Sequence, residues 1–132
     1  VVDLTAVHDI TASMPANFMA QSSAPKQLEN LHKKTPPVEH PVVCTHPETG
    51  RKYLYVNRNF TSYIKDLSRA ESDALLEFLY EHLAQPEFVC RFNWETHSLA
   101  FWDNRCTQHF AVNDYNSLRV MHRVTVCGER PV

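Results

Sequence analysis

The sequence predicts a mostly β domain with flanking helices, an α+β protein whose strands form part of a double-stranded β-helix, or jelly roll. Three observations predict this class. Two short apolar segments flank a turn near residue 50, an amphipathic helix follows near residue 76, and apolar and polar residues alternate through most of 88–127. We expect the helix to cover one side of the strands and polar groups to converge inside the barrel.

Composition limits the classes of function. The chain has 132 residues, of which 43% are hydrophobic, and this is about one domain's worth of sequence with a modest core. Its formal net charge of −2 argues against a nucleic-acid-binding surface, which would usually be basic. The longest apolar runs are far shorter than the roughly 20 residues that span a bilayer, and there is no signal-peptide pattern, so we expect no membrane partner.

The first 39 residues hold few strong signals. Residues 1–10 are too short a stretch to assign, and 11–39 contain four prolines and few large apolar groups. A helix is predicted from about Pro25 to Lys34, with its two leucines on one side. The stretch as a whole predicts a long surface excursion, which is either a functional mobile segment or a disordered tether.

The middle of the chain predicts a hairpin and then a helix. Pro41–His46 and Arg51–Val56 are the expected hairpin strands, and the residues Glu-Thr-Gly form the turn between them. Ser68, followed three positions later by Glu71, is a capping-box pattern. The expected helix runs from about Arg69 to Leu83 with an apolar stripe of Leu75, Leu76, Phe78, Leu79 and Leu83, and it ends before Pro86.

The last part of the chain predicts four strands. They are Phe88–Trp94, Ser98–Asp103, a strand that carries His109, and a strand that returns after the turn at 113–116. On the returning strand, alternate residues share a face: Leu118, Val120, His122, Val124 and Val126 on one side, and Arg119, Met121, Arg123, Thr125 and Cys127 on the other.

The two arginines of the returning strand suggest an anion site. Met121 and Cys127 flank Arg119 and Arg123, so their face is not an ordinary solvent face. A buried guanidinium needs an anionic partner, and its planar fork suits carboxylate, sulfonate or phosphate oxygens. The alternative is that both arginines form salt bridges with acidic residues of a neighbouring loop.

The same segment resembles a known family. WDNRCTQHFAVNDY followed by RVMHRVTVCGERP is similar to the C-terminal motif of the taurine dioxygenase (TauD/TfdA) family, the Fe(II)- and 2-oxoglutarate-dependent oxygenases of sulfonates, sulfate esters and related small acids. LTAVHD at residues 4–9 and HPVVCTHPETGRKYLYVNRNF from His40 to Phe60 also resemble that family. The resemblance covers nearly the whole chain and implies an oxidoreductase with a cupin-like jelly roll. It also places residues 11–39 in an insertion near the active site.

The resemblance, and not composition or spacing, implies a role for three residues. His109 matches the distal histidine of the family's 2-His-1-carboxylate iron triad, Arg119 the arginine that holds the distal carboxylate of 2-oxoglutarate, and Arg123 the arginine that contacts the anionic head of the substrate. The implied cofactors are Fe(II) and the cosubstrate 2-oxoglutarate. With O2, the enzyme would release succinate and CO2 and hydroxylate taurine, another sulfonate or an alkyl sulfate.

The other two iron ligands of the family come from an H-x-D or H-x-E motif. Only His46-Pro47-Glu48 fits this pattern formally, and it lies in the predicted hairpin turn, so we expect it to be a false match. The resemblance places the true motif before Val1. We therefore expect residues 1–132 to be the C-terminal portion of a single dioxygenase domain, inactive alone and prone to self-association as a homo-oligomer.

Two other classes of function stay open. A jelly roll without its iron triad could be a non-catalytic anion-binding module, or the chain could be an interaction fragment that a partner completes. The four cysteines have no C-x-x-C spacing, and each lies in or beside a predicted strand among apolar residues. We expect free, buried thiols and a cytoplasmic location.

The remaining conspicuous residues are assigned structural roles. We expect His122 to be a hydrogen-bonded core residue and Trp102 and Tyr115 to pack. Asp103 should order the turn before His109 and pair with Arg105. His40 and His46 flank the hairpin and are predicted to be surface residues.

Overall fold

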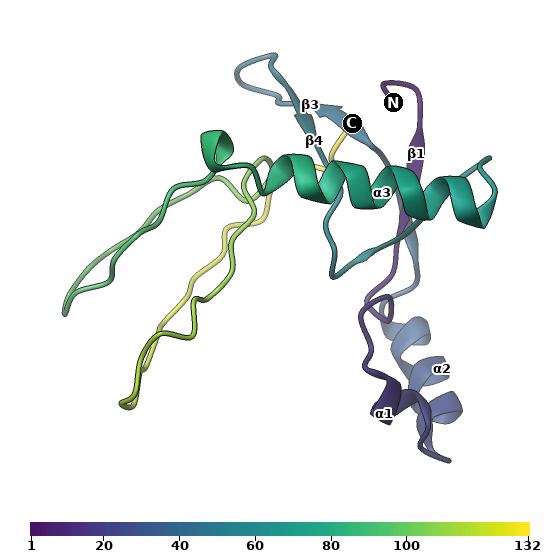
Figure 1. The fold of residues 1–132 in the computed structure, drawn as a ribbon, viewed down its shortest axis with the longest axis horizontal. Helices are drawn as coiled ribbons and strands as arrows, with labels where there is room; N and C mark the ends of the chain where they lie inside the picture. The colour runs from purple at the N-terminus through teal and green to yellow at the C-terminus, as the bar shows by residue number, and fades with distance from the viewer.

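A computed structural model describes all of residues 1–132. The folded body lies between residues 4 and 88 (Figure 1). Its strands are β1 Thr5–His8, β2 Val38–Pro41, β3 Val43–Thr45, β4 Lys52–Leu54 and β5 Thr61–Ile64. Its helices are α1 Ala16–Met19, α2 Ala24–Lys34, α3 Arg69–Leu83 and the single 3-10 turn η1 Pro86–Phe88.

The strands form two small antiparallel sheets. In the first sheet β1 lies between β2 and β5, with Thr5 opposite Pro41 and Ala6 opposite both His40 and Ile64. The second sheet is the β3–β4 hairpin, in which Cys44 lies opposite Tyr53. This confirms the predicted hairpin, whose turn is closed by Gly50 at a φ of 69°, a conformation that glycine adopts without strain. The unassigned first residues supply the central strand.

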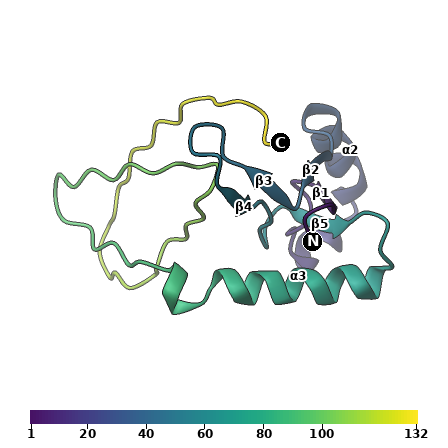
Figure 2. The ribbon, with the colours of Figure 1, turned by 90° about the horizontal axis from the view of Figure 1, so that it is seen from above.

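Helix α3 covers one side of these strands (Figure 2). Its predicted bounds are confirmed, and the capping box forms: Ser68 Oγ accepts from the Glu71 backbone N–H, while the Glu71 carboxylate accepts from the Ser68 N–H. The predicted helix from Pro25 is also confirmed as α2. The apolar stripe is only partly correct, because Phe78 is exposed.

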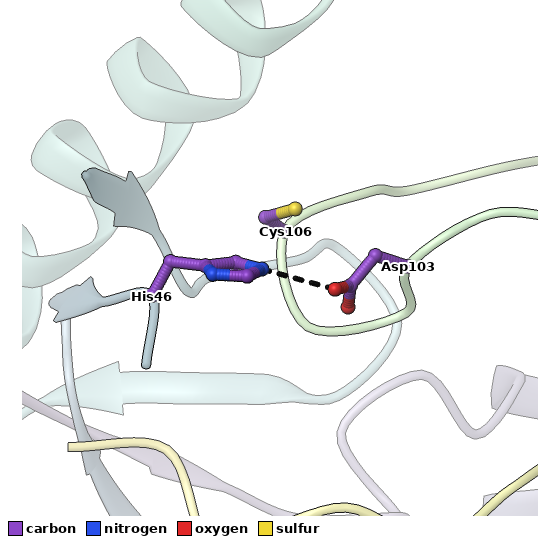
Figure 3. A group of neighbouring side chains, drawn as sticks. All are labelled: His46, Asp103 and Cys106. Atoms are coloured by element: carbon purple, nitrogen blue, oxygen red, sulfur yellow. Dashed lines mark hydrogen bonds and ion pairs between the residues drawn. The ribbon is translucent and has the colours of Figure 1, made fainter. Parts of the chain in front are cut away.

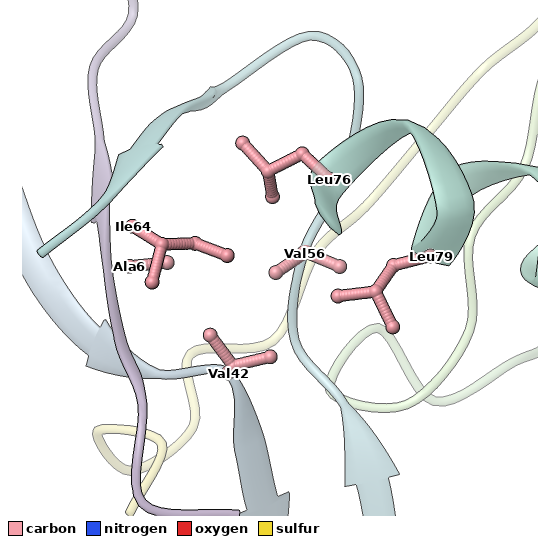
Figure 4. Close-up of a cluster of buried hydrophobic side chains, with 6 residues drawn as sticks. All are labelled: Ala6, Val42, Val56, Ile64, Leu76 and Leu79. Atoms are coloured by element: carbon pink, nitrogen blue, oxygen red, sulfur yellow. The ribbon is translucent and has the colours of Figure 1, made fainter. Parts of the chain in front are cut away.

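The core lies between α3 and the strands (Figure 4). Six side chains from β1, β5, α3 and the ends of the hairpin form it: Ala6, Val42, Val56, Ile64, Leu76 and Leu79. None of the helices combines the length and the apolar character that a membrane-spanning segment needs.

The four strands predicted within residues 88–127 do not form in this structure, since no residue after Phe88 is in a strand. This part of the chain leaves the body as extended loops and returns so that the C-terminus lies beside β3 (Figures 1 and 2). Its apolar side chains point to solvent, with Phe101 97% and Leu118 93% exposed. A β-strand is stable only when its backbone hydrogen-bonds to a neighbouring strand. The residues that alternate between apolar and polar in this segment have no neighbouring strand.

Candidate functional site

The candidate site lies on the loop from Trp102 to Arg123. His109 is exposed, and its ring centroid lies 5.0 Å from that of Trp102. The preceding residue fixes this part of the loop to the body, because Gln108 Nε2 donates to the carbonyl oxygen of the core residue Val56 at 2.6 Å. His109 makes no hydrogen bond or ion pair, so both of its ring nitrogens are free to bind a ligand.

Arg119 is half-buried and lacks the acidic partner that its burial would require. Its guanidinium carbon lies 5.3 Å from the centre of the Tyr115 ring, a cation–π contact, and its Nε is buried with no hydrogen-bond partner. The alternative that Arg119 forms a salt bridge with a neighbouring loop is therefore wrong. The nearby carboxylate of Asp114 pairs with Arg91 instead.

The structure does not assemble the three predicted site residues. No hydrogen bond, ion pair or ring contact joins any two of His109, Arg119 and Arg123. The prediction of an enclosed face is wrong for Arg123, which is exposed, as is His122, which was expected in the core. Both errors have one cause, because the strand that would enclose these residues does not form.

A second polar cluster lies between the β3–β4 hairpin and the turn before His109 (Figure 3). The His46 side chain is only 12% exposed, so the prediction of a surface residue is wrong. Its Nε2 lies 3.0 Å from Asp103 Oδ2 and its Nδ1 lies 3.2 Å from Glu48 Oε2. Arg105 pairs with the same two carboxylates, at 2.5 Å from Asp103 Oδ2 and 2.8 Å from Glu48 Oε2. The predicted pairing of Asp103 with Arg105 is therefore confirmed.

These contacts make the cluster a brace rather than a metal site. Ligand atoms of His46, Asp103 and Cys106 lie within 4.8 Å of one another, close enough to share an ion. The hydrogen bonds from Arg105, and then from His46, hold the pKa of the Asp103 carboxyl well below its usual range. Both of its oxygens already accept hydrogen bonds, and the guanidinium opposes a cation. The brace instead attaches the loop to the hairpin six residues before His109.

Two further sequence expectations concern single residues. All four cysteines are free, as predicted, but only Cys44 is buried. Tyr115 is exposed apart from its contact with Arg119, and the Trp102 Nε1–H donates to Asn104 Oδ1 at 2.9 Å. His40 is half-buried and contacts the rings of His8 and Tyr55, a cluster that no sequence pattern indicated.

Comparisons with known proteins bear on the whole chain. The family model described as taurine catabolism dioxygenase TauD, TfdA family matches residues 1–125. An alkylsulfatase of Acinetobacter baylyi is 41% identical over 114 residues, which are 83% of this chain and 36% of the relative. An alpha-ketoglutarate-dependent sulfonate dioxygenase of Saccharomyces cerevisiae is 42% identical over 120 residues, or 83% of this chain and 29% of the relative.

Solved structures give the same result. The crystal structure of AAD-2 in complex with Mn(II) and N-oxalylglycine matches 70% of this chain and 34% of its own, with a TM-score of 0.57 and 30% identity. A taurine dioxygenase from Burkholderia xenovorans matches 78% of this chain and 38% of its own, with a TM-score of 0.52 and 35% identity. This likeness confirms the predicted class, mostly β with a jelly-roll fold. The chain spans about a third of the length of the curated relatives it matches.

Proposed function

Because the chain belongs to the taurine catabolism dioxygenase TauD, TfdA family, we propose that it is the C-terminal portion of an Fe(II)- and 2-oxoglutarate-dependent dioxygenase. Its substrate is a small anionic molecule, a sulfonate or sulfate ester. The relatives' names support this, since they include alkylsulfatase and alpha-ketoglutarate-dependent sulfate ester dioxygenase. The remainder of the domain, with the H-x-D motif, precedes residue 1 in this proposal.

The observation that carries the proposal is the unpaired Nε of Arg119. A buried guanidinium N–H without an acceptor costs roughly 1–3 kcal/mol, and a carboxylate is the acceptor that fits it best. Tyr115 lies against the guanidinium in a cation–π contact, which does not supply the hydrogen-bond acceptor that Nε lacks. We assign Arg119 to the distal carboxylate of 2-oxoglutarate.

His109 fits the iron for a similar reason. Both of its ring nitrogens are free, and imidazole is a common ligand of non-haem iron. One imidazole cannot hold the ion alone, so the carboxylate and the second histidine come from the rest of the domain. When bound, iron with 2-oxoglutarate and O2 supplies the oxidising chemistry that yields succinate, CO2 and a hydroxylated substrate.

Arg123 is assigned to the anionic head of the substrate. It is exposed and pairs with no carboxylate, so its charge is available to a sulfonate or sulfate group. In the complete domain, this chain would thus supply Arg119 and Arg123 to hold two anions and His109 to bind the metal.

The test is binding of 2-oxoglutarate, or of N-oxalylglycine as its analogue, to the complete protein with Fe(II) under anaerobic conditions. Replacing Arg119 by Ala removes a charge-assisted hydrogen bond, and we expect binding to weaken about 10- to 100-fold. Arg51→Ala, which removes an exposed and unpaired arginine of the hairpin, is the matched control and should bind normally. Equal binding by Arg119→Ala would show that Arg119 does not hold the cosubstrate.

The same titration separates the enzyme from the anion-binding module. A visible charge-transfer band on adding Fe(II) and 2-oxoglutarate, lost in His109→Ala, indicates a chelated iron and supports a dioxygenase. Binding of 2-oxoglutarate without any such band would favour a module that uses only the arginines.

A further inference from the structure

Three aromatic rings meet on one face of the β1–β2–β5 sheet. They belong to His8 at the end of β1, His40 in β2 and Tyr55 just after β4. The ring centroids are 5.5 Å apart for His8 and His40, 5.4 Å for His8 and Tyr55, and 5.2 Å for His40 and Tyr55. Because His40 lies opposite Ala6, two residues before His8, the two imidazoles share a face as diagonal neighbours.

Each imidazole has one buried nitrogen without a partner. These atoms are His8 Nε2 and His40 Nδ1. His8 is only 8% exposed, so water does not replace the missing partner freely. Leaving such a polar atom buried and unpaired is unfavourable, which makes this pair of atoms a candidate for a bound ligand.

The other ring nitrogen of His8 is occupied, since Nδ1 lies 3.4 Å from Thr61 Oγ1. When Nδ1 donates to that hydroxyl oxygen, Nε2 of the neutral ring carries a free lone pair. Metal-binding histidines typically have this arrangement, in which the second ring nitrogen donates to a neighbouring oxygen.

Both rings are ready to bind a cation near neutral pH. Burial, and then repulsion by His40, lowers the pKa of His8 to about 4, and burial also lowers the pKa of His40. The two rings line a cavity of about 280 Å³ with room for further ligands. Two charges of opposite sign lie near the rings. The Asp9 carboxylate lines the cavity and would attract a cation, whereas the positive charge of Arg130 lowers the pKa of His40 and would repel one.

We propose that His8 and His40 form a two-histidine site for a divalent first-row transition-metal ion such as Zn²⁺ or Ni²⁺, distinct from the iron site assigned to His109. The spacing of the rings fits this role. With metal–nitrogen distances of about 2.0–2.1 Å and a tetrahedral angle, two ring centroids would lie roughly 5.2 Å apart. The observed 5.5 Å requires only a small adjustment. Water in the cavity completes the coordination.

The test is a calorimetric titration of the 132-residue chain with Ni²⁺ and with Zn²⁺. Exposed thiols would also bind these ions, so Cys90, Cys106 and Cys127 are first alkylated, while Cys44 is buried and plays no part. We expect one site, and at least tenfold weaker binding in His8→Phe and in His40→Phe, which keep an aromatic ring at each position. His122→Ala removes an exposed histidine and should change nothing.

A second measurement does not depend on how well the variants fold. In the unsubstituted chain, Zn²⁺ should shift the ¹⁵N resonances of His8 Nε2 and His40 Nδ1 more than those of any other histidine. The proposal is overturned if the chain binds neither ion, if both Phe variants bind as tightly as the unsubstituted chain, or if the largest shifts belong to other histidines. None of these results involves Fe(II) or 2-oxoglutarate, so the function proposed for His109 and Arg119 is tested separately.

Discussion

Ser72 offers the sharpest test of how α3 is held on the strands. Its side chain is 1% exposed, and its Oγ accepts a hydrogen bond of 2.8 Å from the backbone N–H of Ile64. Lys65, the next residue, donates to Thr5 in β1, so the Ile64 N–H points away from β1 to the open edge of β5. No strand pairs with that edge, and the helix supplies the acceptor instead.

Replacing Ser72 by Ala removes this acceptor and leaves a buried N–H unpaired. The loss costs roughly 1–3 kcal/mol. Alanine offsets part of it, by up to about 0.5 kcal/mol, because it favours the helix more than serine does. We therefore expect the free energy of unfolding to fall by about 1–2 kcal/mol, which lowers the urea midpoint by roughly 0.5–1 M at an unchanged slope.

The assay is urea unfolding followed by circular dichroism, with amide hydrogen exchange as a local readout. Exchange of the Ile64 amide should accelerate in Ser72→Ala. Ser22→Ala is the matched control, since Ser22 is exposed and its side chain makes no hydrogen bond. If Ser72→Ala and Ser22→Ala had the same midpoint, the hydrogen bond would not stabilise the packing of α3 and our reasoning would be refuted.

Three further predictions concern the cap, the buried histidine and the brace. Ser68→Ala removes the capping box with Glu71, and urea unfolding should show a loss of about 1 kcal/mol, whereas no loss would mean that the cap is not stabilising. In the metal-free chain, His8 titrates at about 4 when folded and at 6.5 when unfolded, so the unfolded state binds more protons between these values. Stability should therefore fall by about 2 kcal/mol from pH 7 to pH 5, and a His8→Gln chain with the same pH dependence would contradict this. His46→Ala breaks the contact with Asp103, so exchange of the Arg105 amide, which donates to Asp103 Oδ1, should accelerate while exchange in α3 stays unchanged. Equal exchange at Arg105 would show that the brace does not hold the loop.

The elements that sequence predicted well are those fixed by local signals. The bounds of α3 follow from the Ser68 cap and from Pro86, and the hairpin turn follows from Gly50. By contrast, β1 could not be assigned because its pairing is non-local: Thr5 lies opposite Pro41. The burial of His46 was missed for the same reason, since its partner Asp103 is 57 residues away.

The candidate site was predicted from resemblance, and the residue pattern alone gave less. Alternation placed Arg119 and Arg123 on one face of a strand, but alternation shows which residues would share a face and not whether a neighbouring strand exists. The sequence predicted partly buried arginines that lack an acidic partner in the chain, and the structure shows this for Arg119. The His8 and His40 pair had no sequence signal, because the two residues are distant along the chain and meet only through strand pairing.

The way the last loop is attached suggests how the site could form. Asp103 binds His46, and the carbonyl oxygen of Val132 accepts from the neighbouring Thr45 N–H at 2.8 Å, so both ends of the loop are fixed to adjacent residues at the end of β3. Closing a loop costs conformational entropy that grows with the logarithm of its length. In this chain the two ends of the loop are already held together by contacts with the folded body, so later pairing does not add this loss. Pairing of this loop with strands from the rest of the domain then requires only local ordering, and the burial of exposed side chains such as Leu118 favours it. In this way the brace would bring His109 and Arg119 into place when the remainder of the barrel is present.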